Sequence, residues 1–205
     1  MKNLYFTADG IISNGLASVK IATTEDSQCV MVILCDECQG MNSELQKYII
    51  DYYNTWFERS YKSLNIVMVK KELNKLLKYC TDMPVRVLVI ASGVYVTSGT
   101  GDICVQLYRK GISLFDISTR RNVGMISGKI KPGDCFIIGS YSLFEKISDW
   151  YVGSMLKRNY ISIYRNREYM SCYEMLVHLQ NYIESKSADE NMTALIVCCN
   201  VSYMN

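Results

Sequence analysis

The segment Val30-Met31-Val32-Ile33-Leu34-Cys35 is an apolar run rich in β-branched residues, and the polar stretch Asp36-Glu37-Cys38-Gln39-Gly40 follows it directly. A short apolar run of this kind is typical of a buried strand, and a polar stretch ending in glycine is typical of a loop. Ser43 and Gln46 then have the spacing of a capping box, and apolar residues recur at helical spacing to about Ser60. The sequence therefore predicts a buried strand, a loop and a long helix in this order.

A second amphipathic helix is expected over Asn65–Lys78, because leucines and valine occupy one side of the helical pattern and four lysines the other. The period then changes to that of strands. Three consecutive antiparallel strands are predicted, with turns at Gly99–Asp102 and Arg109–Gly111: Val85–Ile90, Gly93–Ser98 and Ile103–Tyr108.

In the last third of the chain the same order of elements is predicted again, with a strand, helices and a further strand. Pro132-Gly133-Asp134 predicts a turn into a buried strand over Cys135–Gly139. Helices are expected near Leu143–Arg158 and Cys172–Lys186, followed by a closing strand over Ala194–Cys199. Grouped strands and grouped helices favour an α+β fold over a repeating βαβ fold.

Length and charge narrow the class of protein. A chain of 205 residues suits one domain, which we place over residues 1–205. Its 22 basic and 20 acidic residues leave a net charge of +2, so we expect neither a nucleic acid nor a membrane as partner. The start of the chain reaches Asp9 before any signal-like apolar run, and nine cysteines are an odd number for a disulfide framework. We therefore expect a cytoplasmic protein with reduced thiols.

Four segments, in this order and spacing, resemble the metal-dependent protein phosphatases of type 2C, the PPM family. The family has Asp-Gly-x-Gly-Gly after a strand, Val-Gly-Asp-Ser between strands, Gly-Asp before a strand that ends in Ser-Asp-Gly-Leu, and Asp-Asn-x-Thr before a closing strand. The similar segments of this chain cover roughly residues 10 to 200: Asp36–Gly40, Gly93–Asp102, Pro132–Phe144 and Asp189–Thr193. The resemblance implies a four-layer αββα sandwich, with two antiparallel sheets face to face and helix pairs outside.

The resemblance also implies a centre of two Mg²⁺ or Mn²⁺ ions, which need clustered carboxylates. Asp36 matches the family's bridging aspartate, and Glu37 stands where a glycine carbonyl binds metal. Tyr141 replaces the aspartate of Ser-Asp-Gly, and a phenol with a pKa of about 10 is a poor ligand for Mg²⁺ at neutral pH. Glu190, preceded by Asp189, stands where the family has an aspartate.

The N-terminal match to the family is incomplete. The family has a phosphate-binding arginine followed by Asn-Glu-Asp, whereas the nearest segment here, Gly10–Leu16, has neither the arginine nor the acids. We therefore expect a degenerate member, a pseudophosphatase that acts by protein binding or regulation and holds no metal or one weakly bound Mg²⁺ or Mn²⁺. The alternative is an active serine/threonine phosphatase with a divergent site for two Mn²⁺ or Mg²⁺ ions. A third class is a small-molecule or nucleotide sensor that uses the cleft expected between the two sheets.

Other residues favour less specific interpretations. Cys35 and Cys38 form a Cys-x-x-Cys motif, but the ligands that a zinc site would add, such as Cys198, Cys199 or His178, are not spaced for it, so incidental thiols are expected. Tyrosine and arginine are enriched at binding hot spots, and they gather in the segment of residues 151–173. We expect a partner surface there, for a phosphoprotein or a kinase, although ordinary half-buried tyrosines explain the pattern equally well; its residues are Tyr160, Tyr164, Arg165 and Arg167.

Overall fold

The computed structural model describes residues 2–12, 17–36, 43–80, 83–116, 125–165, 167–186 and 193–203. The chain divides into two compact units, and each is described by itself. Unit 1 comprises Met1–Gly15, Cys104–Ile117 and Lys131–Asn205, and unit 2 comprises Leu16–Ile103 and Ser118–Ile130. The expectation of a single domain over residues 1–205 stays a prediction.

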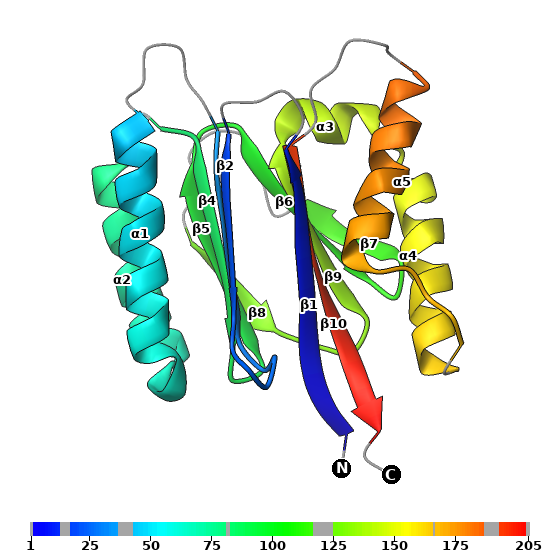
Figure 1. Cartoon of the computed structure of the whole chain (residues 1–205), viewed down its shortest axis with the longest axis horizontal. Helices are drawn as coiled ribbons and strands as arrows, with labels where there is room; N and C mark the ends of the chain where they lie inside the picture. Colours follow the sequence, from blue (N-terminus) through cyan, green and yellow to red (C-terminus); the bar gives the residue numbers. More distant parts are fainter. Residues whose placement is uncertain are drawn as a thin grey trace. The chain divides into compact units, whose positions relative to one another are not determined.

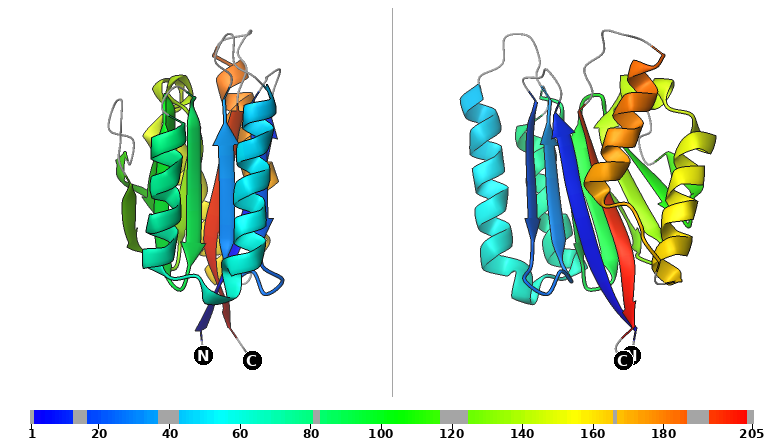
Figure 2. Two further views of the ribbon diagram at one scale, coloured as in Figure 1. Left: turned by 90° about the vertical axis from the view of Figure 1, so that its left-hand side faces the viewer. Right: turned by 45° about the vertical axis from the view of Figure 1, so that its right-hand side comes forward.

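Unit 2 holds a five-stranded antiparallel sheet in the order β2-β3-β4-β5-β8. Its strands are β2 (Ser18–Thr23), β3 (Val30–Cys35), β4 (Val85–Ala91), β5 (Val94–Thr100) and β8 (Ile126–Lys129). The helices are α1 (Ser43–Ser60), the 3-10 turn η1 (Tyr61–Ser63) and α2 (Ile66–Tyr79). Both long helices lie side by side on one face of this sheet, α1 over β2 and β3, α2 over β4 and β5 (Figures 1 and 2).

The core of unit 2 forms where alternate strand residues meet the two helices. Successive side chains of a strand point to opposite faces, so one set faces α1 and α2. This set comes from β3 and β4: Met31, Ile33, Cys35, Val85, Val87 and Val89. Helical spacing brings Ile49, Tyr53 and Phe57 of α1 against them, together with Val69 and Leu73 of α2. Every residue of β3 and β4 is buried, which agrees with their continuous apolar runs.

Unit 1 is built around the sheet β1-β10-β9-β6-β7. Its strands are β1 (Lys2–Ile12), β10 (Thr193–Tyr203), β9 (Asp134–Ser140), β6 (Ile103–Arg109) and β7 (Ile112–Asp116). The helices are α3 (Tyr141–Lys146), α4 (Asp149–Tyr164) and α5 (Cys172–Glu184). Helix α5 packs over β1 and β10, and α4 packs against β7 and β10 (Figure 1). The core contains Ile137, Ala194 and Ile196 of the sheet, with Leu156 of α4 and Leu176 of α5.

Most of the expected elements are confirmed, and two expectations are wrong. The helix expected over Leu143–Arg158 is two helices, α3 and α4, because Ile147 and Ser148 have extended backbones. The new helix begins at Asp149, whose carboxylate accepts a hydrogen bond from the Tyr108 hydroxyl at 2.7 Å. Gln46, expected to complete a capping box, is buried and hydrogen-bonds to Ser18 and to the Asp36 carbonyl. Burial in the core of the unit overrides the local capping signal.

Candidate metal centre

Asp36 stands directly after β3 in unit 2, where the sequence places the best metal ligand. Its backbone N–H donates to the Pro84 carbonyl at 3.0 Å, and its carbonyl accepts from Gln46 Nε2 at 3.3 Å. Gln46 Oε1 in turn accepts from the Ser18 hydroxyl at 3.1 Å. The end of β3 is thereby tied to β2, to α1 and to the residue before β4. The half-buried Asp36 is thus held at a defined point, as a ligand must be. Glu37 lies outside the described residues.

Tyr141 is the first residue of α3 in unit 1 and follows β9 without a loop. The Ser140 hydroxyl caps this helix by accepting the N–H of Leu143 at 3.4 Å. Gly139 lies next to the Leu143 side chain, and a Cβ on Gly139 would collide with it. The expected strand and helix are therefore formed on either side of Ser140, and Tyr141, where the resemblance implies an aspartate, is half-exposed. Asp189 and Glu190 lie outside the described residues.

Asp134, the acid of the Gly133-Asp134 turn, has a structural role in unit 1. Its carboxylate is buried and accepts two hydrogen bonds from Arg109, from Nε at 2.6 Å and from Nη2 at 3.0 Å. The backbone N–H of Lys131 donates to the same carboxylate at 2.8 Å. These three bonds satisfy a buried charge, so Asp134 holds the start of β9 in place.

The donors that the structure describes do not fit a centre of two Mg²⁺ or Mn²⁺ ions. Such a centre needs several carboxylate oxygens, because hard divalent ions prefer charged oxygen ligands. Of the candidate positions, the described ones provide one carboxylate in unit 2 and one phenol in unit 1, at Asp36 and Tyr141. Within the described ranges, no group of three or more His, Cys, Asp or Glu side chains is placed to hold a metal ion.

A buried arginine that the sequence patterns did not reveal lies in β4. Arg86 of β4 is 3% exposed, and its Nε and Nη2 both donate to the Ile103 carbonyl, at 3.1 and 2.7 Å. Gly99, opposite Arg86 on β5, makes room for this side chain, because a Cβ at Gly99 would meet both the Val85 carbonyl and Arg86. A charged residue inside the apolar run Val85–Ile90 was the signal that could have revealed it.

The residues expected to form a partner surface gather at the C-terminal end of α4. The rings of Tyr160 and Tyr164 stack with centroids 6.3 Å apart, and Lys110 Nζ lies 5.6 Å from the Tyr160 ring centroid. Tyr164 is 59% exposed, and Arg165 and Arg167 are exposed in the turn that ends the helix. Tyr160 is half-buried and packs against Gly133. The structure therefore brings these four residues together, with Tyr160 as the inner member.

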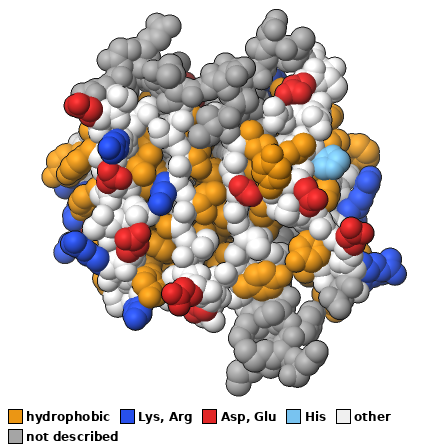
Figure 3. All heavy atoms as spheres, in the orientation of Figure 1, with side chains coloured by type: hydrophobic (Ala, Val, Ile, Leu, Met, Phe, Trp, Pro, Cys, Tyr) orange, Lys and Arg blue, Asp and Glu red, His pale blue; other side chains and the backbone are white. Residues whose placement is uncertain are grey.

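Two other candidates have ordinary surroundings. His178 is exposed on α5 (pale blue in Figure 3). Cys35 is buried, and burial raises the pKa of its thiol to about 12, far from that of a reactive cysteine. Cys38 lies outside the described residues. No helix in the part of the chain that is described combines the length and apolar character needed to cross a membrane.

Comparisons with known proteins find relatives through structure alone. No known family profile matches the sequence, and no curated protein matches it either. A serine/threonine phosphatase of S. agalactiae is similar at 11% identity with a TM-score of 0.61, over 96% of this chain and 99% of that chain. RsbX in complex with magnesium gives 14% identity and a TM-score of 0.61, over 98% of this chain and 100% of that chain.

A third similar structure is a PP2C phosphatase domain. The PP2C phosphatase domain of SpoIIE from Bacillus subtilis, solved with a fragment of its regulatory domain, has 13% identity and a TM-score of 0.61. The match covers 99% of this chain and 64% of that one. Identities this low show the fold alone. The expected α+β class, with two antiparallel sheets and their helices, is confirmed, and the chain has the fold of the type 2C protein phosphatases.

Proposed function

We propose that this chain is a pseudophosphatase, a degenerate type 2C phosphatase domain that acts by binding and regulating other proteins. The observation that carries the proposal is Tyr141, a phenol at the first position of α3, where the resemblance implies a metal-binding aspartate. A phenol is a poorer ligand for Mg²⁺ than a carboxylate, because hard divalent ions prefer charged oxygen. Losing one carboxylate weakens both ions of a two-metal site, since ligands of such a site share its charge.

Asp36 favours a second candidate function. An aspartate whose backbone is held at the end of β3 by Pro84 and Gln46 is the kind of ligand that an active centre would retain. With Glu190 or Asp189 as a replacement ligand, the chain would be an active Mn²⁺- or Mg²⁺-dependent phosphatase acting on phosphoserine or phosphothreonine. The two candidates differ in metal affinity and in turnover, so they can be separated by experiment.

The test is hydrolysis of a phosphoserine peptide with and without millimolar Mn²⁺, beside calorimetric titration of Mn²⁺. The pseudophosphatase proposal expects no metal-dependent turnover in the wild type, in Asp36→Asn or in the matched control Asp51→Asn on the exposed face of α1. It also expects Tyr141→Asp to bind Mn²⁺ more tightly than the wild type does, by about tenfold or more for one added carboxylate. Turnover that needs Mn²⁺ and is lost only in Asp36→Asn would overturn the proposal in favour of the active enzyme.

The partner surface at the end of α4 suits a phosphorylated segment of a protein. Arginine guanidinium groups bind phosphate through two parallel hydrogen bonds, and the exposed Tyr164 ring adds apolar contact. A phosphoprotein or a kinase in the cytoplasm is the partner we propose. Arg165→Ala combined with Arg167→Ala should abolish binding of phosphoserine peptides to the full chain, with the unphosphorylated peptides as control. Equal binding of phosphorylated and unphosphorylated peptides would contradict this surface. So would binding to the double variant that is as tight as binding to the wild type.

A further inference from the structure

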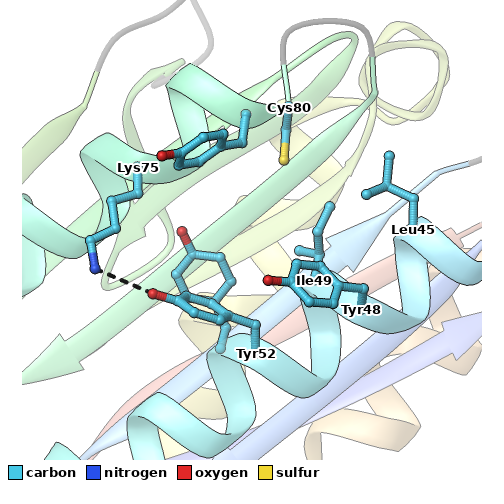
Figure 4. A pocket seen from close by; sticks show the side chains of 8 residues that line it. Leu45, Tyr48, Ile49, Tyr52, Lys75 and Cys80 are labelled. Carbon is cyan, nitrogen blue, oxygen red and sulfur yellow. Dashed lines mark hydrogen bonds between the residues drawn. The ribbon is translucent and has the colours of Figure 1, made fainter.

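A groove runs between α1 and α2 on the outer side of unit 2. A hollow of about 570 Å³ lies between the two helices, and Figure 4 shows the side chains that line it from both sides. Five come from α1, two from α2 and one from the residue after α2: Leu45, Tyr48, Ile49, Tyr52, Tyr53, Lys75, Tyr79 and Cys80. A second hollow of about 480 Å³ shares Tyr48 and Tyr52 and continues along α1 to Ser60.

The walls of the groove leave large aromatic surfaces exposed. Tyr48 is 65% exposed on α1, and Tyr79 is 79% exposed on α2. Leu45, Tyr48 and Tyr52 follow one another at spacings of three and four residues, so they form one stripe along α1. This stripe is about 10 Å long at about 1.5 Å per residue, and the residues of α1 that line the two hollows together extend about 22 Å, from Leu45 to Ser60. An open groove of that length suits a helix of about 15 residues better than a compact small molecule.

The floor of the groove is held in place by a polar network between the two helices. The Tyr52 hydroxyl donates to the Glu72 carboxylate, and Lys75 Nζ lies 2.9 Å from the same carboxylate. Lys75 also donates to the Tyr52 hydroxyl at 3.3 Å, the bond drawn in Figure 4. Glu72 is buried, and its carbonyl accepts from the Tyr53 hydroxyl at 3.4 Å. Because the network joins α1 to α2, the groove is formed before any partner binds, which lowers the entropy cost of binding.

The exposed surface of α2 is basic, and one of its lysines, Lys75, lines the groove. Helix α2 carries four lysines, at positions 70, 71, 75 and 78, and a single acid, Glu72, which is buried and paired with Lys75. Helix α1 carries charges of both signs. In Figure 3 side chains of both charges occur on the left-hand part of the view, where α1 and α2 lie in Figure 1. An acidic occupant would be complementary to the exposed lysines of α2 and would associate faster at low salt.

We propose that the α1–α2 groove binds an acidic amphipathic helix of a partner protein. Its apolar residues, spaced three and four apart, would lie among Tyr48, Tyr52 and Tyr79, and its carboxylates would face the lysines of α2. This inference goes beyond the proposed pseudophosphatase function, since it places a separate binding surface on unit 2 and does not depend on the metal centre or on the surface at the end of α4.

The test uses a display library of amphipathic 15-residue helices, with the apolar and flanking positions randomised, selected on the full chain. Selected peptides should carry Leu, Phe or Trp at i, i+4 and i+7 and more Asp and Glu than the starting library. Synthetic copies should bind about tenfold more weakly to Tyr48→Glu and to Tyr79→Glu, as for interface hot spots. The double variant Lys71→Glu and Lys78→Glu should bind the peptides more weakly than the wild type does. This difference should be largest at low salt, where the wild type binds most tightly.

A matched control is Tyr173→Glu on α5, a tyrosine that is 54% exposed in unit 1. It should bind the selected peptides as the wild type does, and circular dichroism should show every variant folded. Peptides without an acidic excess, or equal binding to the Tyr79→Glu variant, would overturn the proposal. So would sedimentation showing that Tyr79→Glu dissolves a dimer of this chain while no peptide is selected. None of these outcomes bears on phosphatase turnover, which is measured separately.

Discussion

Arg109 and Asp134 form a buried ion pair with two hydrogen bonds, which joins the end of β6 to the start of β9. Asp134 is 1% exposed, and Lys131 supplies a third hydrogen bond from its backbone. In the sequence this acid belongs to a Gly-Asp turn that contributes to the phosphatase resemblance. In the structure its charge is used to hold two strands of unit 1 together.

Asp134→Asn should destabilise the chain by about 2 kcal/mol, because Arg109, whose side chain is 25% exposed, loses its buried carboxylate partner. Urea unfolding followed by circular dichroism measures the change. Asp51→Asn, on the exposed face of α1, is the control and should change the free energy of unfolding by less than about 0.5 kcal/mol. A loss at Asp134→Asn no larger than that of the control would show that the pair contributes little.

Gly153→Ala should also destabilise the chain, although alanine favours a helix by about 1 kcal/mol over glycine. Gly153 of α4 faces Gly111, the turn residue between β6 and β7, and a Cβ on either would lie closer than 3.0 Å to the backbone of the other. Gly111 also has a φ of +79°, which other residues rarely adopt. Overpacking costs about 1–3 kcal/mol, so the net loss at Gly153→Ala should be about 1 kcal/mol or more. Thermal unfolding measures it, with Ser154→Ala as the neighbouring control, and an unchanged midpoint would contradict the close approach.

The buried thiols should react slowly with iodoacetamide in the folded protein. Burial raises the pKa of Cys35 and that of Cys199 to about 12, and the negative charge of Asp134 adds to the shift at Cys199. At pH 8 only about one thiol in ten thousand is then ionised, and the thiolate is the reactive form. Mass spectrometry after timed alkylation should find both thiols unmodified in buffer and modified in urea. Equal rates in both conditions would mean that β3 and β10 open easily.

The N-terminus of α5 should make stability depend on pH. Ser171 and Glu174 form a capping box, in which the Glu174 carboxylate accepts the Ser171 N–H at 2.7 Å. This hydrogen bond lowers the pKa of Glu174 below its ordinary value of 4.5. A lowered pKa in the folded state means that the stabilisation is complete above the ordinary pKa and is lost as the pH falls through the folded one.

The measurement for this capping box compares the melting temperatures of the wild type and Glu174→Gln at pH 6 and pH 3. The wild type should melt higher at pH 6, because only a charged carboxylate makes the stronger bond. The difference should shrink at pH 3, where the protonated acid resembles glutamine. Glu168→Gln, an exposed residue outside the helix, should show no such change. A constant difference at both pH values would rule out the charge as the cause.

Local periodicity predicted much of each unit. The bounds of β3 were predicted to the residue and those of α1 closely, because an apolar run and a helical repeat each report one local backbone state. The break between α3 and α4 was not predicted: Ile147 and Ser148 are extended, and the new helix begins at Asp149, which accepts a hydrogen bond from Tyr108, 41 residues away in the sequence. Gln46 was assigned to a cap because its position and spacing suit a cap, and only the neighbouring Ser18 and Asp36 show its actual partners.

For the candidate metal centre, too, some residue positions could be predicted from the sequence and other residue roles could not. The sequence predicted that Asp36 directly follows a strand and that Tyr141 lies close to the start of a helix, because the neighbouring residues show these elements. The roles of Asp134 and Arg86 were not predictable, since the partner of a buried charge is chosen by strand pairing and not by neighbouring residues.

The sequence alone determined the α+β class, most of the helices and the strands β3, β4, β5, β6, β9 and β10, whereas β1, β2, β7 and β8 were not predicted. The predicted elements follow from residue type and period along a single stretch of chain. Only the tertiary structure decided that Asp134 pairs with Arg109 and that α1 and α2 leave a groove lined by Tyr48 and Tyr79. Periodicity shows which face of a helix is apolar, but whether a neighbouring element covers that face depends on contacts between distant segments.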